Sequence, residues 1–377
     1  MHKPKILIFI DWFTPAYKAG GPIKSVSNIV NSLSDVFDFY IITSDRDIND
    51  EKPFKNILLN QWVSKKKYTI AYLTEDKRNQ FISEVLTEIK FSKFYFNSLF
   101  SKEYTLKPIK KINQLKQKSK IILAPRGMLG KGALKIKKLK KKAFLKTTKT
   151  LGFFKEITWH TTDSDETEDV KINYGNNVTI FSSPNISILN FDKKEVLKKN
   201  KQLKLLFFSR ITSKKNLLYA LKLLKNANKE NLTLDIYGTL EDQDYWLECE
   251  NYINSHKLSA VYCGELEPKE INSVLSNYHF LLFPTLHENY GHVIVEALTA
   301  GCGLIISTNT PWRELKHANV GYDINLKNQN EFDQAIDKLY LLNQEEYNKI
   351  RNNCYEYINN EILKQNAVQL TKNMFLQ

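Results

Sequence analysis

Short, uninterrupted apolar runs alternate with longer amphipathic stretches through the first half of the chain. Runs without polar alternation are typical of strands that are buried on both faces of a parallel sheet. In the stretches between them, apolar positions recur with the period of a helix. This alternation predicts a doubly wound parallel sheet with helices on both faces. The predicted strands are residues 5–10, 38–43, 69–73, 94–96, 121–124, 157–160 and 178–181, and the predicted helices are 23–33, 78–90, 104–117 and 165–174.

The pattern restarts after residue 202. Between the two series, residues 183–202 hold Pro184 and a stretch rich in Lys and Asn, which is typical of a linker. The sequence therefore predicts an α/β protein with two Rossmann-like domains, residues 1–182 and 203–360. Ligands of such sheets bind beyond the carboxyl ends of the strands, so we expect the domains to face each other across a cleft. The predicted strands of the second domain are 203–208, 233–237, 261–263, 280–283 and 303–307, and its helices are 216–226, 243–256, 269–277 and 293–300, with helix again from about 344.

The composition is that of an ordinary globular protein: of 377 residues, 42% are hydrophobic and 25% are charged. No run approaches the roughly 18 apolar residues of a membrane-spanning helix. Residues 1–13 contain charged side chains and no signal-peptide cleavage site. The cysteines have no metal-ligand spacing, which fits small core residues in a reducing cytoplasm. They are Cys249, Cys263, Cys302 and Cys354.

The net charge of +14 lies wholly in the first half of the chain. Residues 1–182 contain 33 Lys and Arg against 18 Asp and Glu, whereas residues 183–377 contain 22 against 23. Lysines crowd the segment from Lys131 to Lys149, where apolar residues interleave at approximately helical spacing. This segment fits either a solvated helix whose apolar stripe packs on its own domain or an interfacial helix on the anionic inner face of the cell membrane. Its aromatic residues form no recognisable nucleic-acid-binding module, so no nucleic-acid partner is expected.

The candidate chemistry is concentrated around Glu288, which precedes an apolar helical stretch that contains Glu296. If the spacing were wholly helical, roughly 12 Å would separate them, which is comparable with the span from the ribose to the hexose of a nucleotide sugar. The N–H groups of Asn289, Tyr290 and Gly291 would lie at the helix start, where the helix dipole favours a phosphate. An N-capping acid followed by a helix-surface glutamate gives the same spacing. An unpartnered carboxylate in an apolar run would, however, be costly, and this favours a functional role.

Two cations follow the first predicted strand of the second domain. Arg210 and Lys215 lie in one loop at the carboxyl end of this strand. A planar guanidinium and a compact ammonium suit a diphosphate whose charge grows as it leaves, although a solvated basic turn is the alternative. In the first domain, Gly20 and Gly21 follow the first strand, where a glycine pair permits close approach to a ligand. This loop is neither a Walker A loop nor a GxGxxG motif.

These elements, in this order, resemble the GT4-type retaining glycosyltransferases of the GT-B fold. The resemblance covers most of the chain and is strongest over residues 203–308. It rests on the family's E-x7-E motif, here Glu288 and Glu296, and on its strand-Arg-x4-Lys element, here Arg210 and Lys215.

The resemblance implies further features of the donor site. Gly238 and Leu266 would lie in nucleotide-binding turns of the second domain, and the first domain would bind the acceptor. A helix over residues 361–377 would cross back to the first domain. The implied catalysis is front-face attack by the acceptor hydroxyl, with the leaving phosphate taking its proton. Arg210 and Lys215 would stabilise the leaving diphosphate, so catalysis would consist mostly of positioning and electrostatics.

The chain departs from the family on the acceptor side. Several members have a His after the strand that ends here at Ala124, and this sequence has Arg126. Arginine is a poor base, but it can contact a donor or acceptor phosphate. His160 lies at the end of another predicted strand, where a structural hydrogen bond is the alternative to a catalytic role. Arg126 and His160 are the acceptor-side candidates.

We therefore predict retaining transfer of a hexosyl group from a nucleotide diphosphosugar to a glycan or lipid-diphosphate-linked acceptor, as in the synthesis of bacterial surface polysaccharides. We expect no cofactor and no metal site, because the implied route does not require a metal. The chain has three Asp-x-Asp pairs, of which roughly one is expected by chance, and none precedes the mixed sheet of the other, metal-dependent glycosyltransferase fold. Two alternatives use the same fold. A sugar-nucleotide epimerase would need an acid/base set that the sequence does not assemble, and a non-catalytic protein would only bind a nucleotide or a membrane partner.

Overall fold

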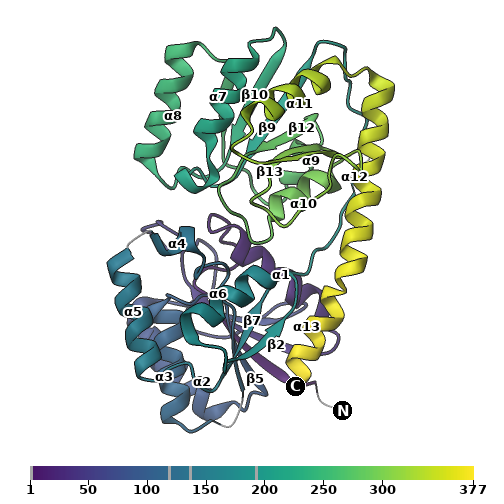
Figure 1. The fold of residues 1–377 in the computed structure, drawn as a ribbon. Coiled ribbons are helices and arrows are strands. Elements are labelled where there is room, and N and C mark those ends of the chain that lie inside the picture. Colours follow the sequence, from purple (N-terminus) through teal and green to yellow (C-terminus); the bar gives the residue numbers. More distant parts are fainter. Residues whose placement is uncertain (1–2, 118–119, 136–137, 192–193) are drawn as a thin grey trace. The chain divides into compact units, whose positions relative to one another are not determined.

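The computed structural model describes residues 3–117, 120–135, 138–191 and 194–377. The chain divides into two compact units, each built on one sheet with helices packed against it (Figure 1). Unit 1 contains residues 1–186 together with 366–377, and unit 2 contains residues 187–365. The predicted linker, residues 183–202, is divided between them. In its second part, Val196 and Lys198 are buried within unit 2.

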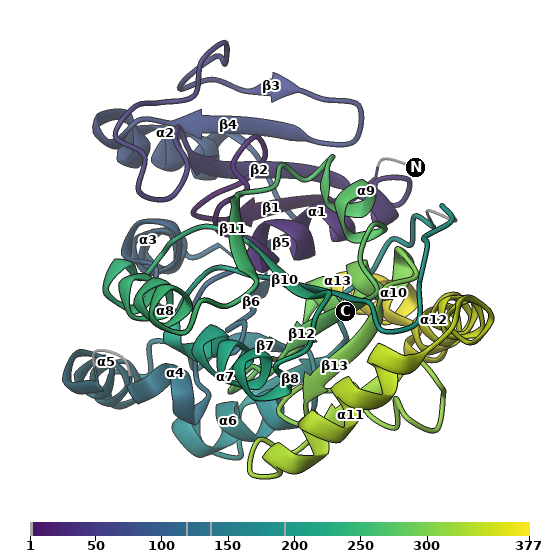
Figure 2. The same ribbon diagram turned by 90° about the horizontal axis from the view of Figure 1, so that it is seen from above.

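Unit 1 contains an eight-stranded sheet in the order β3-β4-β2-β1-β5-β6-β7-β8, and Figure 2 shows β4, β2 and β1 side by side. The short β3 is antiparallel to β4, and the other pairs are parallel. The strands are β1 (Lys5–Phe9), β2 (Asp38–Ser44), β3 (Val63–Ser64), β4 (Thr69–Leu73), β5 (Lys93–Phe96), β6 (Lys120–Leu123), β7 (Ile157–Thr161) and β8 (Thr179–Ser182). The helices are α1 (Gly21–Leu33), α2 (Glu75–Glu88), the π-helical turn η1 (Lys102–Leu106), α3 (Lys107–Gln114), α4 (Lys131–Lys135), α5 (Lys138–Thr150) and α6 (Ser164–Tyr174).

Both faces of this sheet are buried. In β1, Ile6 and Ile8 join the core on the face covered by α1, whereas Leu7 and Phe9 join the core on the face covered by α2 and α3. Because each face needs apolar side chains, the strand is apolar at every position from Ile6 to Phe9. This is the physical reason for the uninterrupted runs in the sequence.

Unit 2 contains a six-stranded parallel sheet in the order β11-β10-β9-β12-β13-β14. Its strands are β9 (Leu203–Phe208), β10 (Leu232–Tyr237), β11 (Ala260–Gly264), β12 (Phe280–Phe283), β13 (Gly303–Ser307) and β14 (Gly321–Ile324). Its helices are η2 (Ser213–Lys215), α7 (Leu217–Ala227), α8 (Gln243–His256), α9 (Ile271–Leu275), α10 (His292–Thr299), α11 (Gln329–Leu341) and α12 (Gln344–Gln365). The edge strand β14 was not predicted, because Tyr322 and Asp323 interrupt its apolar pattern.

The last helix belongs to unit 1. Helix α12 ends at Gln365, Asn366 adopts a left-handed conformation with φ 47°, and α13 (Ala367–Leu376) begins. In unit 1, the Phe375 ring lies 5.5 Å from that of Phe37 and 5.6 Å from that of Tyr95. The core of unit 1 is therefore completed by residues 366–377.

The buried thiols are those of Cys249, Cys302 and Cys354, whereas Cys263 is exposed. The prediction that the cysteines are small core residues thus holds for three of them. In the described part of the chain, every helix is too short or too polar to cross a bilayer.

Candidate functional site

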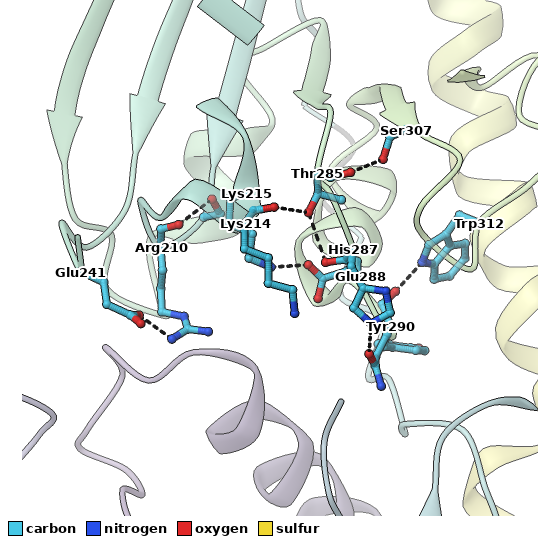
Figure 3. A network of polar contacts seen from close by, with 12 residues as sticks. Arg210, Lys214, Lys215, Glu241, Thr285, His287, Glu288, Tyr290, Ser307 and Trp312 are labelled. Atoms are coloured by element: carbon cyan, nitrogen blue, oxygen red, sulfur yellow. Dashed lines mark hydrogen bonds and ion pairs between the residues drawn. The ribbon is translucent and has the colours of Figure 1, made fainter. Parts of the chain in front are cut away.

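The residues predicted to carry the chemistry follow two neighbouring strands of unit 2. Strand β9 lies between β10 and β12, and the strand order runs outward in opposite directions from the β9–β12 pair. Ligands of open α/β sheets bind beyond the carboxyl ends of the strands at such a switch point. Arg210 and Lys215 follow β9, and Glu288 follows β12. Figure 3 shows that their side chains lie close together at this edge.

Lys215 and Glu288 form an ion pair, in which Lys215 Nζ donates a hydrogen bond to Glu288 Oε2. The two side chains are mostly buried, with 13% and 19% of their surfaces exposed. Burial by itself would raise the pKa of the Glu288 carboxyl, but Lys215, together with Lys214 and Arg210, outweighs burial and lowers the pKa. Glu288 is therefore a charged carboxylate at neutral pH.

Backbone contacts hold the two loops together. The carbonyl oxygen of Lys214 accepts a hydrogen bond from Thr285 Oγ1 at 3.3 Å, and the Thr285 carbonyl accepts one from Ser307 Oγ at 2.5 Å. Asn216 Nδ2 donates to the Pro284 carbonyl at 2.9 Å. The ion pair thus rests on loops whose own polar groups are satisfied, which favours a preorganised site.

Arg210 forms a second ion pair, with Glu241 in the loop after β10. Its Nη1 lies 2.5 Å from Glu241 Oε2, and the side chains are 39% and 36% exposed. A pair this exposed contributes little to stability, so the guanidinium remains available to a ligand. Nothing in the sequence around Glu241 indicated this contact.

Gly238 is required by the packing of two strand ends. It has φ 136°, and a Cβ atom at this position would lie 1.7 Å from the carbonyl oxygen of Ser209. The Gly238 N–H donates to the Gly264 carbonyl at 2.9 Å, next to the turn that contains the half-buried Leu266. The two turns expected to bind nucleotide are therefore adjacent, and Gly238 allows one of them to approach the loop of Arg210.

Gly291 places the start of α10 directly behind Glu288. It adopts φ 79°, and its carbonyl accepts hydrogen bonds from Ile294 N at 2.8 Å and Val295 N at 3.3 Å. A Cβ atom here would lie 2.9 Å from Ile294 Cδ1 and 3.2 Å from Glu288 Cγ. Because α10 begins at His292 with Gly291 as its N-cap, the terminal N–H groups of the helix start at Gly291, the last residue of the predicted set of Asn289, Tyr290 and Gly291.

The other side chains of this segment have local partners. His287 Nε2 lies 2.7 Å from Asn289 Oδ1, and the buried Tyr290 hydroxyl lies 2.6 Å from Ser187 Oγ. Glu296 is half-buried in α10, between the buried Val295 and Ala297. Glu296 therefore lies at the boundary of the apolar face of the helix.

In unit 1, Gly20 and Gly21 lie at the start of α1. Gly20 has φ 66°, and a Cβ atom there would have no neighbour within 4 Å, so backbone conformation and not space favours glycine. Asp47 Oδ2 accepts hydrogen bonds from Tyr17 N at 2.8 Å and Lys18 N at 3.1 Å, which fastens the preceding loop. Asp47 was not predicted.

Arg126 and His160 meet through a third residue of unit 1. His160 Nε2 donates to the Ser183 carbonyl at 3.0 Å, so Nδ1 accepts from the Tyr95 hydroxyl at 2.9 Å. That hydroxyl in turn accepts from Arg126 Nη2 at 2.7 Å. Burial, aided by the charge of Arg126, lowers the pKa of His160 to about 3. At 1% exposure, His160 has the structural role and not the catalytic one.

The residues that hold the candidates in place, such as Glu241, Asp47 and Tyr95, have no distinctive local spacing. Only the order of strands in each sheet reveals that they contact the predicted residues. Within the described ranges, no group of three or more His, Cys, Asp and Glu side chains is placed to hold a metal ion.

Residues 190–357 match the family model of the glycosyl transferases group 1. Comparison of the sequence with curated proteins finds no match.

Solved structures with the same fold cover nearly the whole chain. HepE from Anabaena, in complex with UDP and glucose, has a TM-score of 0.69 and 13% identity, over 99% of this chain and 100% of that chain. An α,α-trehalose-phosphate synthase (UDP-forming) from Burkholderia xenovorans has a TM-score of 0.71 and 8% identity, over 99% of both chains. WaaG, a glycosyltransferase involved in lipopolysaccharide biosynthesis, has a TM-score of 0.66 and 12% identity, over 98% of this chain and 99% of that chain. These likenesses confirm the predicted GT-B fold with two Rossmann-like domains.

Proposed function

We propose that this chain, whose residues 190–357 match the glycosyl transferases group 1, transfers a hexosyl group from a nucleotide diphosphosugar with retention of the anomeric configuration. The acceptor would be a glycan or a lipid-linked glycan in the synthesis of bacterial surface polysaccharide. The observation that carries the proposal is the Lys215–Glu288 ion pair at the switch point of unit 2, with Arg210 in the same loop as Lys215.

The charges of this edge suit a donor that is anionic at one end and rich in hydroxyls at the other. Arg210 and Lys215 would contact the diphosphate, and the first N–H groups of α10 would add donors. Glu288, kept ionised by the neighbouring cations, would accept hydrogen bonds from sugar hydroxyls. Glu296 would accept from the ribose. Neither glutamate needs to act as a nucleophile.

The proposed reaction is a front-face displacement. The acceptor oxygen forms a bond to the anomeric carbon while the bond from that carbon to the diphosphate oxygen breaks. The acceptor proton passes to the leaving diphosphate, so charge and atoms balance without a protein base. Arg210 and Lys215 stabilise the growing negative charge, and the proposal therefore includes no metal and no cofactor.

Helix α5 supports the proposed contact with an anionic membrane. Phe144 packs inward, with its ring 5.0 Å from that of Phe100, as the packed-stripe alternative requires. Leu139 in α5 and Leu151 directly after it are 83% and 72% exposed. Lysines surround these leucines, and those with exposed side chains are Lys138, Lys140, Lys142, Lys146 and Lys149. Exposed leucines among lysines are typical of an interfacial helix. Lys137 lies outside the described residues.

The proposal is tested by donor turnover. The full chain is mixed with a panel of nucleotide sugars and a bacterial membrane extract, and free nucleoside diphosphate is measured. We expect one donor to release nucleoside diphosphate, and only when the extract is present. We also expect the product to have the same anomeric configuration as the donor. Binding of a donor without release would favour the non-catalytic alternative, and an inverted product would contradict the front-face route.

A further inference from the structure

Unit 1 has a switch point of its own. Strand β1 lies between β2 and β5, and the order runs outward from the β1–β5 pair. Gly20 follows β1, Asn97 follows β5, and Arg126 follows β6, the next strand of the sheet. Asn97 Nδ2 donates to the Pro22 carbonyl at 3.1 Å, which connects the start of α1 to this group. Arg126 therefore lies at the edge of the sheet where a ligand is expected.

The backbone at Arg126 is strained and firmly held. Arg126 has φ 53° and Gly127 has φ 70°, and a left-handed conformation costs an arginine about 1 kcal/mol. The buried carboxyl of Glu166 accepts a hydrogen bond from Gly127 N at 2.5 Å and another from Thr162 N at 2.8 Å. A strained backbone conformation that a buried contact maintains indicates a functional requirement. Here the requirement is that the Arg126 side chain points in one direction.

The guanidinium is held by three neutral acceptors from two segments, the end of β5 and the stretch after β8. Nε donates to Asn97 Oδ1 at 2.7 Å, Nη1 to Asn185 Oδ1 at 2.6 Å, and Nη2 to the Tyr95 hydroxyl at 2.7 Å. Each bond uses one N–H of its nitrogen. The second N–H of Nη1 and that of Nη2 are left to a ligand.

The charge of Arg126 is not neutralised by an ion pair. Among the described residues, no carboxylate lies within ion-pair distance of its guanidinium. Glu166 is near enough for its pKa to be affected by Arg126, but its oxygens are bound to Gly127 and Thr162. Since the Arg126 side chain is half-buried, its field is less screened than that of a surface arginine.

The contacts beneath Arg126 are oriented to hold its guanidinium in place. The Tyr95 hydroxyl gives its proton to His160, so its oxygen can only accept from Arg126. This order requires His160 to be neutral at Nδ1. Tyr95 and His160 are therefore positioning residues for Arg126.

We propose that Arg126 binds a phosphate group of the acceptor, as part of the proposed glycosyl transfer on which this inference rests. A planar guanidinium with free N–H groups matches phosphate oxygens and fixes their direction. The acceptor class is thus a phosphate- or diphosphate-linked glycan and not a neutral sugar. Arg126 orients this group and takes no part in proton transfer.

The test measures the affinity of the full chain for inorganic pyrophosphate by calorimetry, in the presence of a saturating nucleoside diphosphate that fills the donor site. We expect Arg126→Gln to weaken pyrophosphate binding by about tenfold to a hundredfold, the effect of losing charge-assisted hydrogen bonds. Arg126→Lys should restore part of the affinity. Tyr95→Phe should weaken binding less than Arg126→Gln, with Arg126 still charged. The control Lys155→Gln removes an equal charge from an exposed position at the opposite end of the sheet, before β7, and should change nothing.

Three outcomes overturn the proposal. The first is an unchanged pyrophosphate affinity in a folded Arg126→Gln variant. The second is an Arg126→Lys variant that loses thermal stability without any change in its pyrophosphate affinity. The third is that the nucleotide prevents pyrophosphate from binding and that Arg126→Gln lowers the affinity for the nucleoside diphosphate. This outcome would assign Arg126 to the donor site. Failure of the proposed function is separate, since the wild-type chain would then release no nucleoside diphosphate from any donor.

Discussion

Lys215 and Glu288 form a largely buried ion pair that joins the loop after β9 to the loop after β12. Removing one partner would leave the other charge buried without compensation, which is costly. The pair therefore keeps Glu288 charged in the free protein. The diphosphate of a donor can contact Lys215, and the hydroxyl groups of its sugar can contact Glu288.

Loss of either partner should abolish most turnover. We expect Lys215→Ala and Glu288→Ala each to lower kcat by about a hundredfold or more, as removal of an electrostatic donor does. The double variant should be little worse than either single one, because the residues act as a unit. Release of nucleoside diphosphate at saturating donor measures the effect. Lys222→Ala, on the exposed side of α7, is the matched control, and near-normal rates in both single variants would contradict the assignment.

Gly238 should tolerate no side chain. Gly238→Ala places a Cβ atom 1.7 Å from the Ser209 carbonyl oxygen, so the loop of Arg210 must move. We expect a loss of about 3 kcal/mol or more in the free energy of unfolding, together with weaker nucleotide binding. Gly264→Ala is the comparison, because Gly264 also has positive φ but no atom within 4 Å of the added Cβ. It should cost about 1–2 kcal/mol. Equal effects in chemical denaturation would refute the steric explanation.

Acid should destabilise unit 1 through His160. Burial lowers the pKa of His160 from 6.5 to about 3, so between these values the unfolded chain binds a proton that the folded chain does not. The contribution of neutral His160 to the free energy of unfolding is fully present above pH 6.5 and is lost as the pH falls toward 3. The stability advantage of the wild type over His160→Gln should therefore narrow between pH 7 and pH 5 in thermal unfolding. If the stability advantage of the wild type over His160→Gln stayed constant over this pH range, this would contradict a neutral His160 in the folded protein.

Helix α5 should bind anionic vesicles. The triple substitution of Lys138, Lys142 and Lys146 by Gln should weaken binding by about 3 kcal/mol at low salt, because each lysine near the surface contributes about 1 kcal/mol. Leu139→Ser should weaken binding by loss of apolar burial. Co-sedimentation with vesicles that contain phosphatidylserine measures both effects. A control with Lys52, Lys55 and Lys66 changed to Gln has the same net charge and should bind as the wild type; equal loss in the two triple variants would indicate attraction without a docking face.

The parallel sheets follow from the sequence because strands covered on both faces must be apolar throughout. Residues 190–357 match the glycosyl transferases group 1, in agreement with the predicted kind of family. The edge strands β3 and β14 were not predicted, since an edge strand is less covered and its pattern is mixed. Arg210, Lys215 and Glu288 could be proposed together because each follows a strand that the sequence reveals.

The supporting residues could not be found in this way. Glu241 contacts Arg210, and Asn185 contacts Arg126, only because particular strand ends are neighbours in the sheet. A linear sequence shows that strands exist but does not show their order. His160 shows the same point, since its environment and not its residue type decides that it stays neutral.

Helix α13 makes the first half of the chain depend on its last residues. Phe375 packs against Tyr95, whose hydroxyl orients Arg126. During synthesis, strands β1 to β8 leave the ribosome long before the helix that completes their core. Unit 1 therefore cannot finish folding as it emerges and has to wait until unit 2 has been made. The surroundings of Arg126 would therefore be among the last parts of the chain to take up their folded arrangement.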